Sequence, residues 1–367
     1  MSHPARLASR GRFRIGAIGA VLSAAALLTG CGAFPEASGA SESPGSDETT
    51  TVRYQGWASQ VGFNELAEDL GYFDNVELEW VGNTISGPQD IQSVATNQID
   101  VGGAFNGAVV KLAATGAPIT PVIAYYGADS ENYHGYYVLE GSPIRSARDL
   151  IGKKIGVNTL GAHHEFIIRE WLAQQGLTKD EIAQVELVVV PPVNTEQALR
   201  QGQIDAGTLG SVFRDTALDR GGIRPLFTDE SLFGSFSYGT QIFRNDFIEQ
   251  NPEAVADYVQ GVSRAIRWAQ TTPREEVIEK FREIIESRGR NESTEFIEHW
   301  KSTGVGNSGG VIDEKEIQIW IDWLVRNGEL AEGQLTASDV FTNEFVPYAN
   351  GTLDPASGPN GEEVEAR

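Results

Sequence analysis

The sequence predicts a mixed α/β fold built as two lobes of the same design. The first observation is an internal repeat, in which Gln98-Ile99-Asp100-Val101-Gly102 returns as Gln203-Ile204-Asp205-Ala206-Gly207. Both copies follow a helical stretch and precede a glycine turn with proline and an apolar strand, which is typical of duplicated units. Strand and helix patterns also alternate, which favours a largely parallel sheet. Two such lobes enclose a cleft, where small ligands bind.

The first half of the chain predicts strand–helix units in series. We expect strands at 52–54 and 76–81, a helix ended by Gly71, and a helix from Ser86 to about Asn97 that opens on a capping-box pattern with Pro88. In open α/β sheets ligands bind beyond the carboxyl ends of the strands. This rule places the loops at 55–59, 84–87 and 103–106 at the cleft.

The second half predicts strands at 135–139, up to Val157, and at 185–190, the last of them buried. Crossings near 139–143 and 233–238 would form a hinge that closes by bending. The expected domains are a first lobe of 52–139 with 240–345, a second lobe of 140–239, and a disordered tail of 354–367. Helical patterns at 252–269, 273–285, 293–300 and 314–325 are predicted to pack on the first lobe.

The charge balance is acidic, with 28 Lys and Arg against 51 Asp and Glu, a formal net charge of −23. This balance argues against nucleic acid or an anionic lipid surface as a partner. It does not exclude an anionic ligand, because the local field of a cleft can oppose the field of the whole molecule.

Residues 1–30 read as a secretory signal, with four arginines ahead of an uncharged run at 15–30. The run is short for a membrane span, which needs roughly 20 apolar residues. The only cysteine, Cys31, follows Leu28-Thr29-Gly30, which resembles the lipobox at which signal peptidase cuts and the thiol is lipidated. We expect a lipid anchor at Cys31 and a flexible linker over 31–51. A single cysteine also excludes internal disulfides and cysteine-based metal sites.

The sharpest candidate site is Gly161-Ala162-His163-His164, at the start of a predicted helix. A helix start presents N–H groups and the positive end of the dipole, which suits an anion, and the histidines could add donors. A metal site on His163, His164 and Glu165 is a weaker alternative, because adjacent residues point in different directions from a helix and no matching histidine pair lies nearby. Solvent-facing histidines are the plain alternative, and His134 is predicted to lie in a surface loop.

Other candidates come from the remaining cleft loops. Trp57 is either a pocket wall or part of a small core, whereas Asp100 is predicted to be structural, because its copy Asp205 occupies the same place in the repeat. The residues expected to contact a ligand are Gln55, Gly56, Trp57, Ser86, Gly103, Asn106, Tyr126, Gly161, Ala162, His163, Ser211, Phe213 and Tyr238.

Six motifs together resemble those of bacterial ABC-transporter substrate-binding lipoproteins of the aliphatic sulfonate, taurine, nitrate and thiamine-precursor group. They are the lipobox, Tyr54-Gln55, Gly87-Pro88-Gln89, 97–103, 141–144 followed by 149–153, and 201–206. The resemblance covers roughly residues 50 to 345 and implies a two-lobed periplasmic-binding fold of type II with a hinge. It implies a protein that hands a small ligand to a permease driven by a cytoplasmic ATPase. We also expect a monomer without cofactor or metal, anchored on the outer face of the bacterial cytoplasmic membrane.

The resemblance leaves the ligand class open. Sulfonate binders of this type often carry Ser or Thr where this chain has Ala162-His163-His164, yet backbone N–H groups survive any substitution. A small organic anion, sulfonate-like or a carboxylate, is therefore the first expectation. An aromatic wall could instead accept an aromatic carboxylate or a thiamine-precursor pyrimidine, and its members would be Trp57, Tyr125, Tyr126, Phe213 and Tyr238.

Two other classes of function compete with solute transport. We do not expect an enzyme, because related pyrimidine synthases, which consume a histidine and pyridoxal phosphate, resemble a cytosolic, cysteine-rich pattern. This chain instead has an export signal and one cysteine. A solute sensor that signals to a membrane receptor stays open beside transport.

Overall fold

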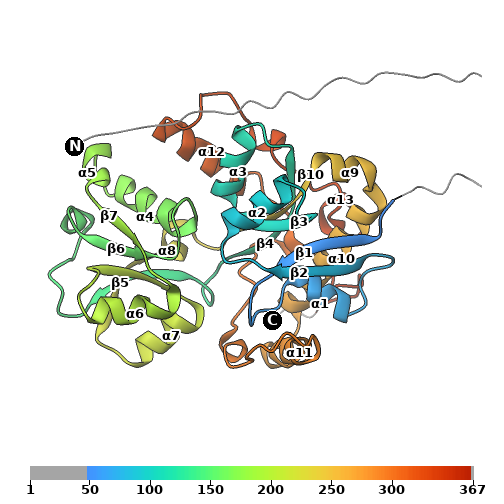
Figure 1. The fold of residues 1–367 in the computed structure, drawn as a ribbon, viewed down its shortest axis with the longest axis horizontal. Helices are drawn as coiled ribbons and strands as arrows, with labels where there is room; N and C mark the ends of the chain where they lie inside the picture. The colour runs from blue at the N-terminus through green and yellow to red at the C-terminus, as the bar shows by residue number, and fades with distance from the viewer. Residues whose placement is uncertain (1–47, 365–367) are drawn as a thin grey trace, which may run out of the picture. The chain divides into compact units, whose positions relative to one another are not determined.

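The computed structural model describes residues 48–364. It contains two five-stranded sheets, each in its own lobe, with strand orders β2-β1-β3-β10-β4 and β7-β6-β8-β5-β9 (Figure 1). The predicted mixed α/β class is confirmed. We call the part built on the first sheet the first lobe and the part built on the other the second lobe.

In the first lobe, β1 is parallel to β2 and β3, and β10 is antiparallel to β3 and β4. Helices α2 and α3 lie on one side of this sheet and α1 and α10 on the other (Figure 1). The strands are β1 (Thr51–Gly56), β2 (Glu77–Asn83), β3 (Val101–Phe105), β4 (Ile119–Ala128) and β10 (Phe236–Arg244). The helices are α1 (Phe63–Asp69), α2 (Gly87–Ala95), α3 (Asn106–Ala114), α9 (Asn245–Gln250), α10 (Pro252–Thr271), α11 (Arg274–Ser287), α12 (Lys315–Asn327) and α13 (Pro347–Asn350).

In the second lobe, β6 is parallel to β7 and β8, and β5 is antiparallel to β8 and β9. The strands are β5 (His134–Leu139), β6 (Lys154–Val157), β7 (Glu186–Val189), β8 (Ala206–Gly210) and β9 (Ile223–Thr228). The helices are α4 (His163–Gln174), α5 (Lys179–Ala183), α6 (Pro192–Arg200), α7 (Ser211–Asp219) and α8 (Asp229–Phe233). Four short 3-10 helices are Ala147–Leu150, Ile297–His299, Ser308–Gly310 and Ala337–Asp339.

The two sheets show the duplication that the repeat predicted. Strands β1 to β4 correspond in order to β6 to β9, and each sheet takes its antiparallel strand from beyond its own repeat. The Asp100 carboxylate accepts the backbone N–H of Arg53 at 2.9 Å, and the Asp205 carboxylate accepts that of Lys154 at 2.9 Å. The structural role predicted for Asp100 is therefore confirmed.

The crossings between the lobes lie earlier in the chain than predicted. Strand β5 pairs with β8 and β9, so it belongs to the second sheet rather than to the first. The chain therefore leaves the first sheet through 129–133 and returns through 229–235, which contains α8. His134 correspondingly begins a strand and does not lie in a surface loop. The sequence pattern placed the strand but not the sheet that it joins.

Three other segments differ from the sequence expectation. Strand β7 lies at a sheet edge, where Val189 is 54% exposed, so it is not buried. The predicted helix at 293–300 is only a 3-10 turn at Ile297–His299. Residues 354–364 are not a disordered tail, because α10 holds them: Arg264 Nε donates to the Pro359 carbonyl at 3.0 Å and Arg267 Nε to that of Ser357 at 2.7 Å.

Aromatic rings of the two lobes pack against one another near the start of α4. Phe166 of α4 contacts Phe105 of the first sheet and Trp323 of α12, with centroids 5.0 and 4.3 Å away. A Cβ on Gly107, at the start of α3, would lie 2.8 Å from the Phe166 ring, so a larger residue would push the helices apart. This packing keeps the start of α4 close to the first lobe.

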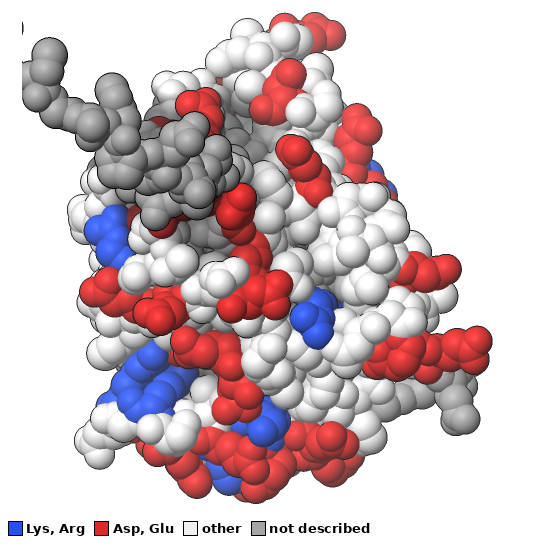
Figure 2. All heavy atoms as spheres, turned by 90° about the vertical axis from the view of Figure 1, so that its right-hand side faces the viewer, with Lys and Arg blue, Asp and Glu red and all other residues white. Residues whose placement is uncertain are grey.

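The surface agrees with the acidic composition. Figure 2 shows one face of the first lobe, on which Asp and Glu side chains dominate. None of the helices within 48–364 is long and apolar enough to span a membrane. The expected signal, linker and lipidated Cys31 lie outside the described residues.

Candidate functional site

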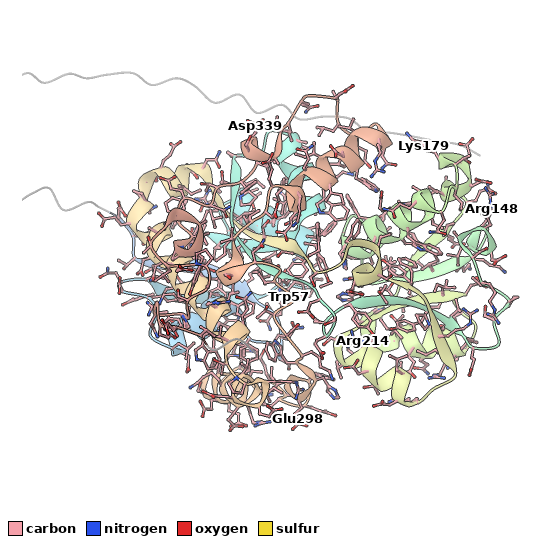
Figure 3. The ribbon with its side chains drawn as sticks, turned by 180° about the vertical axis from the view of Figure 1, so that it is seen from behind. Trp57, Arg148, Lys179, Arg214, Glu298 and Asp339 are labelled. Atoms are coloured by element: carbon pink, nitrogen blue, oxygen red, sulfur yellow. The ribbon has the colours of Figure 1, made fainter. Side chains whose placement is uncertain are left out.

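The end of β1 carries three of the predicted ligand contacts. The Gly56 carbonyl accepts the N–H of Thr84 at 2.9 Å, which closes the β1 and β2 loops against each other. Trp57 is partly exposed, at the edge of the first lobe that faces the second (Figure 3). The buried Oε1 of Gln55 has no hydrogen-bond partner among the described residues. This atom is an acceptor that a ligand donor could satisfy.

Ser86 and Gly103 lie beside a buried carboxylate. Ser86 is the N-cap of α2, and Asp90, in the first turn, accepts the N–H of Gly103 at 2.7 Å. Burial raises the pKa of Asp90 to about 7, and the bond from Gly103 offsets only part of that rise. A Cβ on Gly103 would lie 2.7 Å from the Tyr125 ring, so this glycine lets Tyr125 lie against the sheet.

Asn106 is placed in the core rather than in an open cleft. Its side chain is 0% exposed, and its Nδ2 donates to the carbonyls of Ser237 at 3.3 Å and Glu316 at 3.1 Å. These bonds tie the start of α3 to β10 and α12. These contacts give the Asn106 amide nitrogen a structural role, whereas its buried Oδ1 has no hydrogen-bond partner among the described residues.

The loop before α4 is hydrogen-bonded to a glutamate in the first turn of that helix. Gly161 has a φ of +71°, and its N–H donates to Oε2 of Glu165 at 2.8 Å. Ala162 is the buried N-cap, and its carbonyl accepts the N–H groups of Glu165 and Phe166. One N–H that we expected to face an anion is thus occupied by a carboxylate of the same helix.

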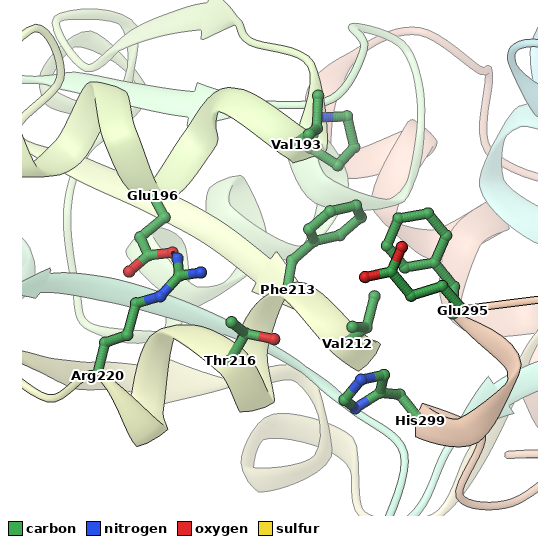
Figure 4. Close-up of a pocket in the computed structure, with 10 residues that line it drawn as sticks. Val193, Glu196, Val212, Phe213, Thr216, Arg220, Glu295 and His299 are labelled. Atoms are coloured by element: carbon green, nitrogen blue, oxygen red, sulfur yellow. Dashed lines mark hydrogen bonds and ion pairs between the residues drawn. The ribbon is translucent and has the colours of Figure 1, made fainter. Parts of the chain in front are cut away.

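Ser211 and Phe213 begin α7 beside a cavity of about 250 Å³ between α6, α7 and residues 295–299 (Figure 4). Ser211 is exposed with a φ of +48°, and the Phe213 ring lies 6.1 Å from that of Phe296. Figure 4 shows Phe213 and Val212 facing Glu295 and His299 across the cavity. The structure thus separates Phe213 from the rings of the α4 loop.

Three predicted contacts, Tyr126, His163 and Tyr238, form a ladder of rings. The Tyr126 ring lies 5.1 Å from that of Tyr238, which stacks on His163 at 4.1 Å. Tyr125 extends the ladder, with its centroid 4.8 Å from that of Tyr126. The ladder joins the carboxyl end of β4 to the start of α4, so it crosses from one lobe to the other.

Asp229, which the sequence did not point to, and His134, which was expected in a surface loop, complete this centre. Asp229 is 1% exposed and accepts the N–H of His134 at 2.9 Å, the Tyr238 hydroxyl at 3.2 Å and the N–H of Glu230 at 2.8 Å. Burial alone would raise the pKa of Asp229, but the imidazoles of His134 and His163 lower it well below its usual range. Burial lowers the pKa of both His163 and His164. No sequence motif marks this set, because its members meet only through the crossings.

Arg214 fastens the first crossing. Its guanidinium is buried, lies 3.9 Å over the Tyr133 ring, and donates to the carbonyls of Tyr133 at 3.0 Å and Glu131 at 3.1 Å. Figure 3 places it on the second lobe, across from Trp57. The hinge is thus held by side chains of α7 as well as by its own turn.

Two α/β lobes joined by two crossings, with helices that start at the carboxyl ends of parallel strands, define the architecture of two-lobed periplasmic binding proteins. A family model described as NMT1/THI5 like matches residues 61–276, more than half of the chain. The chain therefore belongs to the NMT1/THI5-like family, as the resemblance implied.

Known relatives include both binding proteins and an enzyme. A protein of Escherichia coli (strain K12) named for binding aliphatic sulfonates is 27% identical over 164 residues, 44% of this chain and 49% of that protein. A 4-amino-5-hydroxymethyl-2-methylpyrimidine phosphate synthase of Candida albicans (strain WO-1) is 26% identical over 224 residues, 57% of this chain and 63% of that protein. The chain thus spans about half to two thirds of these relatives.

The fold matches solved structures over most of its length. The alkanesulfonate-binding protein SsuA from Xanthomonas axonopodis pv. citri, solved bound to MOPS, superposes with a TM-score of 0.60 at 18% identity. The match covers 80% of this chain and 99% of that one. At this identity the likeness confirms the two-lobed fold and leaves the ligand to be argued from the site.

Proposed function

We propose that this chain is the extracytoplasmic solute-binding component of an ABC importer, capturing a small organic anion, sulfonate-like, between its lobes. The observation that carries the proposal is the ring ladder, which brings residues of both lobes together beside the two crossings. A ligand held there would contact both lobes and favour their closed arrangement. Delivery to a permease, driven by a cytoplasmic ATPase, follows from the same proposal, as does a lipid anchor at Cys31.

The anion is supported by helix geometry. Helices α2, α3, α4, α6 and α7 all begin after the carboxyl end of a parallel strand. Each contributes the positive end of its dipole at that edge. Two of the relatives, from Escherichia coli and Bacillus subtilis, are named for aliphatic sulfonates, and the SsuA structure holds MOPS, which is a sulfonate with a ring.

A planar ring is the second candidate, and a specific observation favours it. In the ladder, Tyr238 and His163 stack on each other, and Tyr125 and Tyr126 stay partly exposed beside them, whereas Glu165 already occupies the Gly161 N–H. The free acceptor Oε1 of Gln55 would suit a ligand with an N–H donor. An aromatic carboxylate or a thiamine-precursor pyrimidine has this chemistry.

A thermal-shift scan of the full chain tests both candidates. The panel holds alkyl sulfonates, MOPS, taurine, nitrate, aromatic carboxylates and aminopyrimidines. A ligand at 100 times its Kd should stabilise the fold by about 2.7 kcal/mol. A shift with sulfonates supports the anion, a shift with rings alone supports the second candidate, and no shift with any member contradicts both.

Two further measurements sharpen the scan. Trp57→Ala should weaken a ring ligand by about tenfold or more, whereas Leu218→Ala, which trims an exposed side chain on α7, should leave affinity unchanged. Because one relative is a pyrimidine synthase, the absorption spectrum of the purified chain is a second check. Bound pyridoxal phosphate would overturn the assignment as a binding protein.

A further inference from the structure

Three histidines meet beside the crossings. Two of them are neighbours on one helix, and the third lies on a separate strand. His134 begins β5, and His163 and His164 begin α4. One ring nitrogen of each lies within 4.8 Å of the others. The ring centroids are 5.2 Å apart for His134 and His163, 4.9 Å for His134 and His164, and 5.4 Å for His163 and His164.

These separations fit a tetrahedral metal centre. Zinc–nitrogen bonds of about 2.0–2.1 Å place ligand nitrogens about 3.4 Å apart and the ring centroids about 5 Å apart. The centroids already stand at this spacing, and rotation of the rings would bring the nitrogens inward. We propose that His134, His163 and His164 form a binding site for a first-row divalent transition metal, with Zn²⁺ as the best match.

Asp229 supplies the negative charge that such a centre needs. Its Oδ2 lies 3.3 Å from His163 Nε2 and 3.5 Å from His134 Nδ1, and its side chain is 1% exposed. Metal-bound histidines commonly have a carboxylate beside them, which orients the rings and raises their basicity. Asp229 is therefore a positioning residue of the site.

The carboxylate decides which nitrogen of each ring is left for a metal. His163 Nε2 and His134 Nδ1 face Asp229, and His134 Nδ1 also lies 3.2 Å from the Tyr238 hydroxyl, so the opposite nitrogens, His163 Nδ1 and His134 Nε2, would be the ligands. Neither forms a hydrogen bond within residues 48–364, and His164 Nδ1 accepts only a long bond, 3.4 Å, from the Asn158 N–H.

The site has an entry path and a choice of metal. The His134 side chain is 29% exposed, whereas that of His163 is 10% exposed, so an ion would arrive past His134. Three imidazoles and no thiolate favour Zn²⁺, Cu²⁺ or Ni²⁺ over Ca²⁺ or Mg²⁺, which take oxygen ligands. The site goes beyond solute capture and does not depend on the identity of the solute.

A metal bound at this site would link the two crossings between the lobes. His134 follows the first crossing, and Asp229 lies at the start of the second. A bound ion would connect both to the start of α4. Metal binding should therefore also raise the midpoint of thermal unfolding.

The test uses the full chain without a histidine tag, stripped of metal with a chelator and free of organic ligand. Titration with Co²⁺ should give the visible bands of a tetrahedral site, saturating at one equivalent and bleached by Zn²⁺. His134→Gln should weaken Zn²⁺ binding at least tenfold, and Asp229→Asn by about 10- to 100-fold. His299→Gln is the matched control, since it removes an imidazole that is outside the cluster.

Folding of each variant is checked by its thermal melt in chelator, where His134→Gln should match the parent chain because the side chain is partly exposed. If His134→Gln melts early, competition between Co²⁺ and Zn²⁺ in the parent chain decides the question. Absence of stoichiometric Co²⁺ or Zn²⁺ binding by the parent chain overturns the proposal. So does equal loss of binding in His134→Gln and His299→Gln.

Discussion

The imidazole of His163 stacks on the phenol ring of Tyr238, with centroids 4.1 Å apart and planes 14° apart. His163 begins α4 in the second lobe, and Tyr238 lies on β10 in the first. The stack is therefore a direct contact between the lobes. Any opening of the hinge must break it or carry it along.

Removing the Tyr238 hydroxyl should break the hydrogen bond that links the stacked rings to Asp229. Tyr238→Phe keeps the ring but loses the 3.2 Å bond to Asp229, so we expect a loss of about 1 kcal/mol in urea unfolding. Tyr126→Phe is the control, because burial alone raises the pKa of that hydroxyl and no hydrogen bond to it is seen within 48–364. Equal losses in both variants would contradict this assignment.

The duplicated aspartates should differ in their contribution to stability. Asp100 is 4% exposed and holds both the N–H and the guanidinium of Arg53, whereas the Asp205 side chain is 37% exposed. Asp100→Asn should cost about 2 kcal/mol and Asp205→Asn less than about 1 kcal/mol. Chemical denaturation of the two variants compares them at the same place in the repeat, and a larger loss for Asp205→Asn would refute the ranking.

The planar guanidinium group of Arg214 should stabilise the first crossing. Arg214→Lys keeps the charge but cannot donate to both the Tyr133 and Glu131 carbonyls while stacking on the Tyr133 ring, so a loss of about 2 kcal/mol is expected. Arg220→Lys, on the exposed end of α7, should change stability by less than about 0.5 kcal/mol. The thermal midpoints of the two variants measure the contrast.

Asp90 should make part of the stability depend on pH. Its folded pKa of about 7 lies above its unfolded value, so its contribution is fully present below about pH 4 and is lost as pH rises to about 7. Asp90→Asn removes this titration and keeps an oxygen for the Gly103 N–H. The variant should therefore gain on the parent chain by up to about 1.4 kcal/mol per pH unit over this window.

Urea unfolding at pH 5, 6, 7 and 8 follows that difference. Asp246→Asn is the control, because it makes the same substitution at a carboxylate whose side chain is 60% exposed. A difference between Asp90→Asn and the parent chain that stays constant from pH 5 to pH 7 would show that Asp90 does not titrate there.

The sequence predicted what is local or repeated and missed what depends on long-range placement. The repeat around Asp100 and Asp205 announced two equal lobes, and the helix starts at Ser86 and Ala162 followed from short-range signals. The sheet that β5 joins depends on pairing with β8 and β9, which no local pattern encodes. Asp229 was therefore not predicted and His134 was placed in a surface loop, since only that pairing brings them to His163.

Glu165 offers the sharpest test of the ligand class. Its carboxylate accepts the Gly161 N–H at 2.8 Å, pairs with Arg169 at 2.8 Å, and places a negative charge at the start of α4. Glu165→Gln removes that charge while keeping an oxygen acceptor. If an anion binds at this helix start, its affinity should rise by about two- to tenfold, because the helix-dipole interaction is worth roughly 0.3–1 kcal/mol and the opposing charge is gone.

The matched control lies on the next helix. Glu181 of α5 accepts the Thr178 N–H at 2.8 Å and pairs with Arg148 at 2.7 Å in the same arrangement, but α5 follows another helix rather than the end of a strand. Calorimetric titration of the best ligand from the panel should therefore show no change in Glu181→Gln. For a neutral ring ligand, Glu165→Gln should also leave affinity unchanged. A tighter anion in Glu165→Gln alone assigns the binding site to the start of α4, because only there does the removed charge face the ligand.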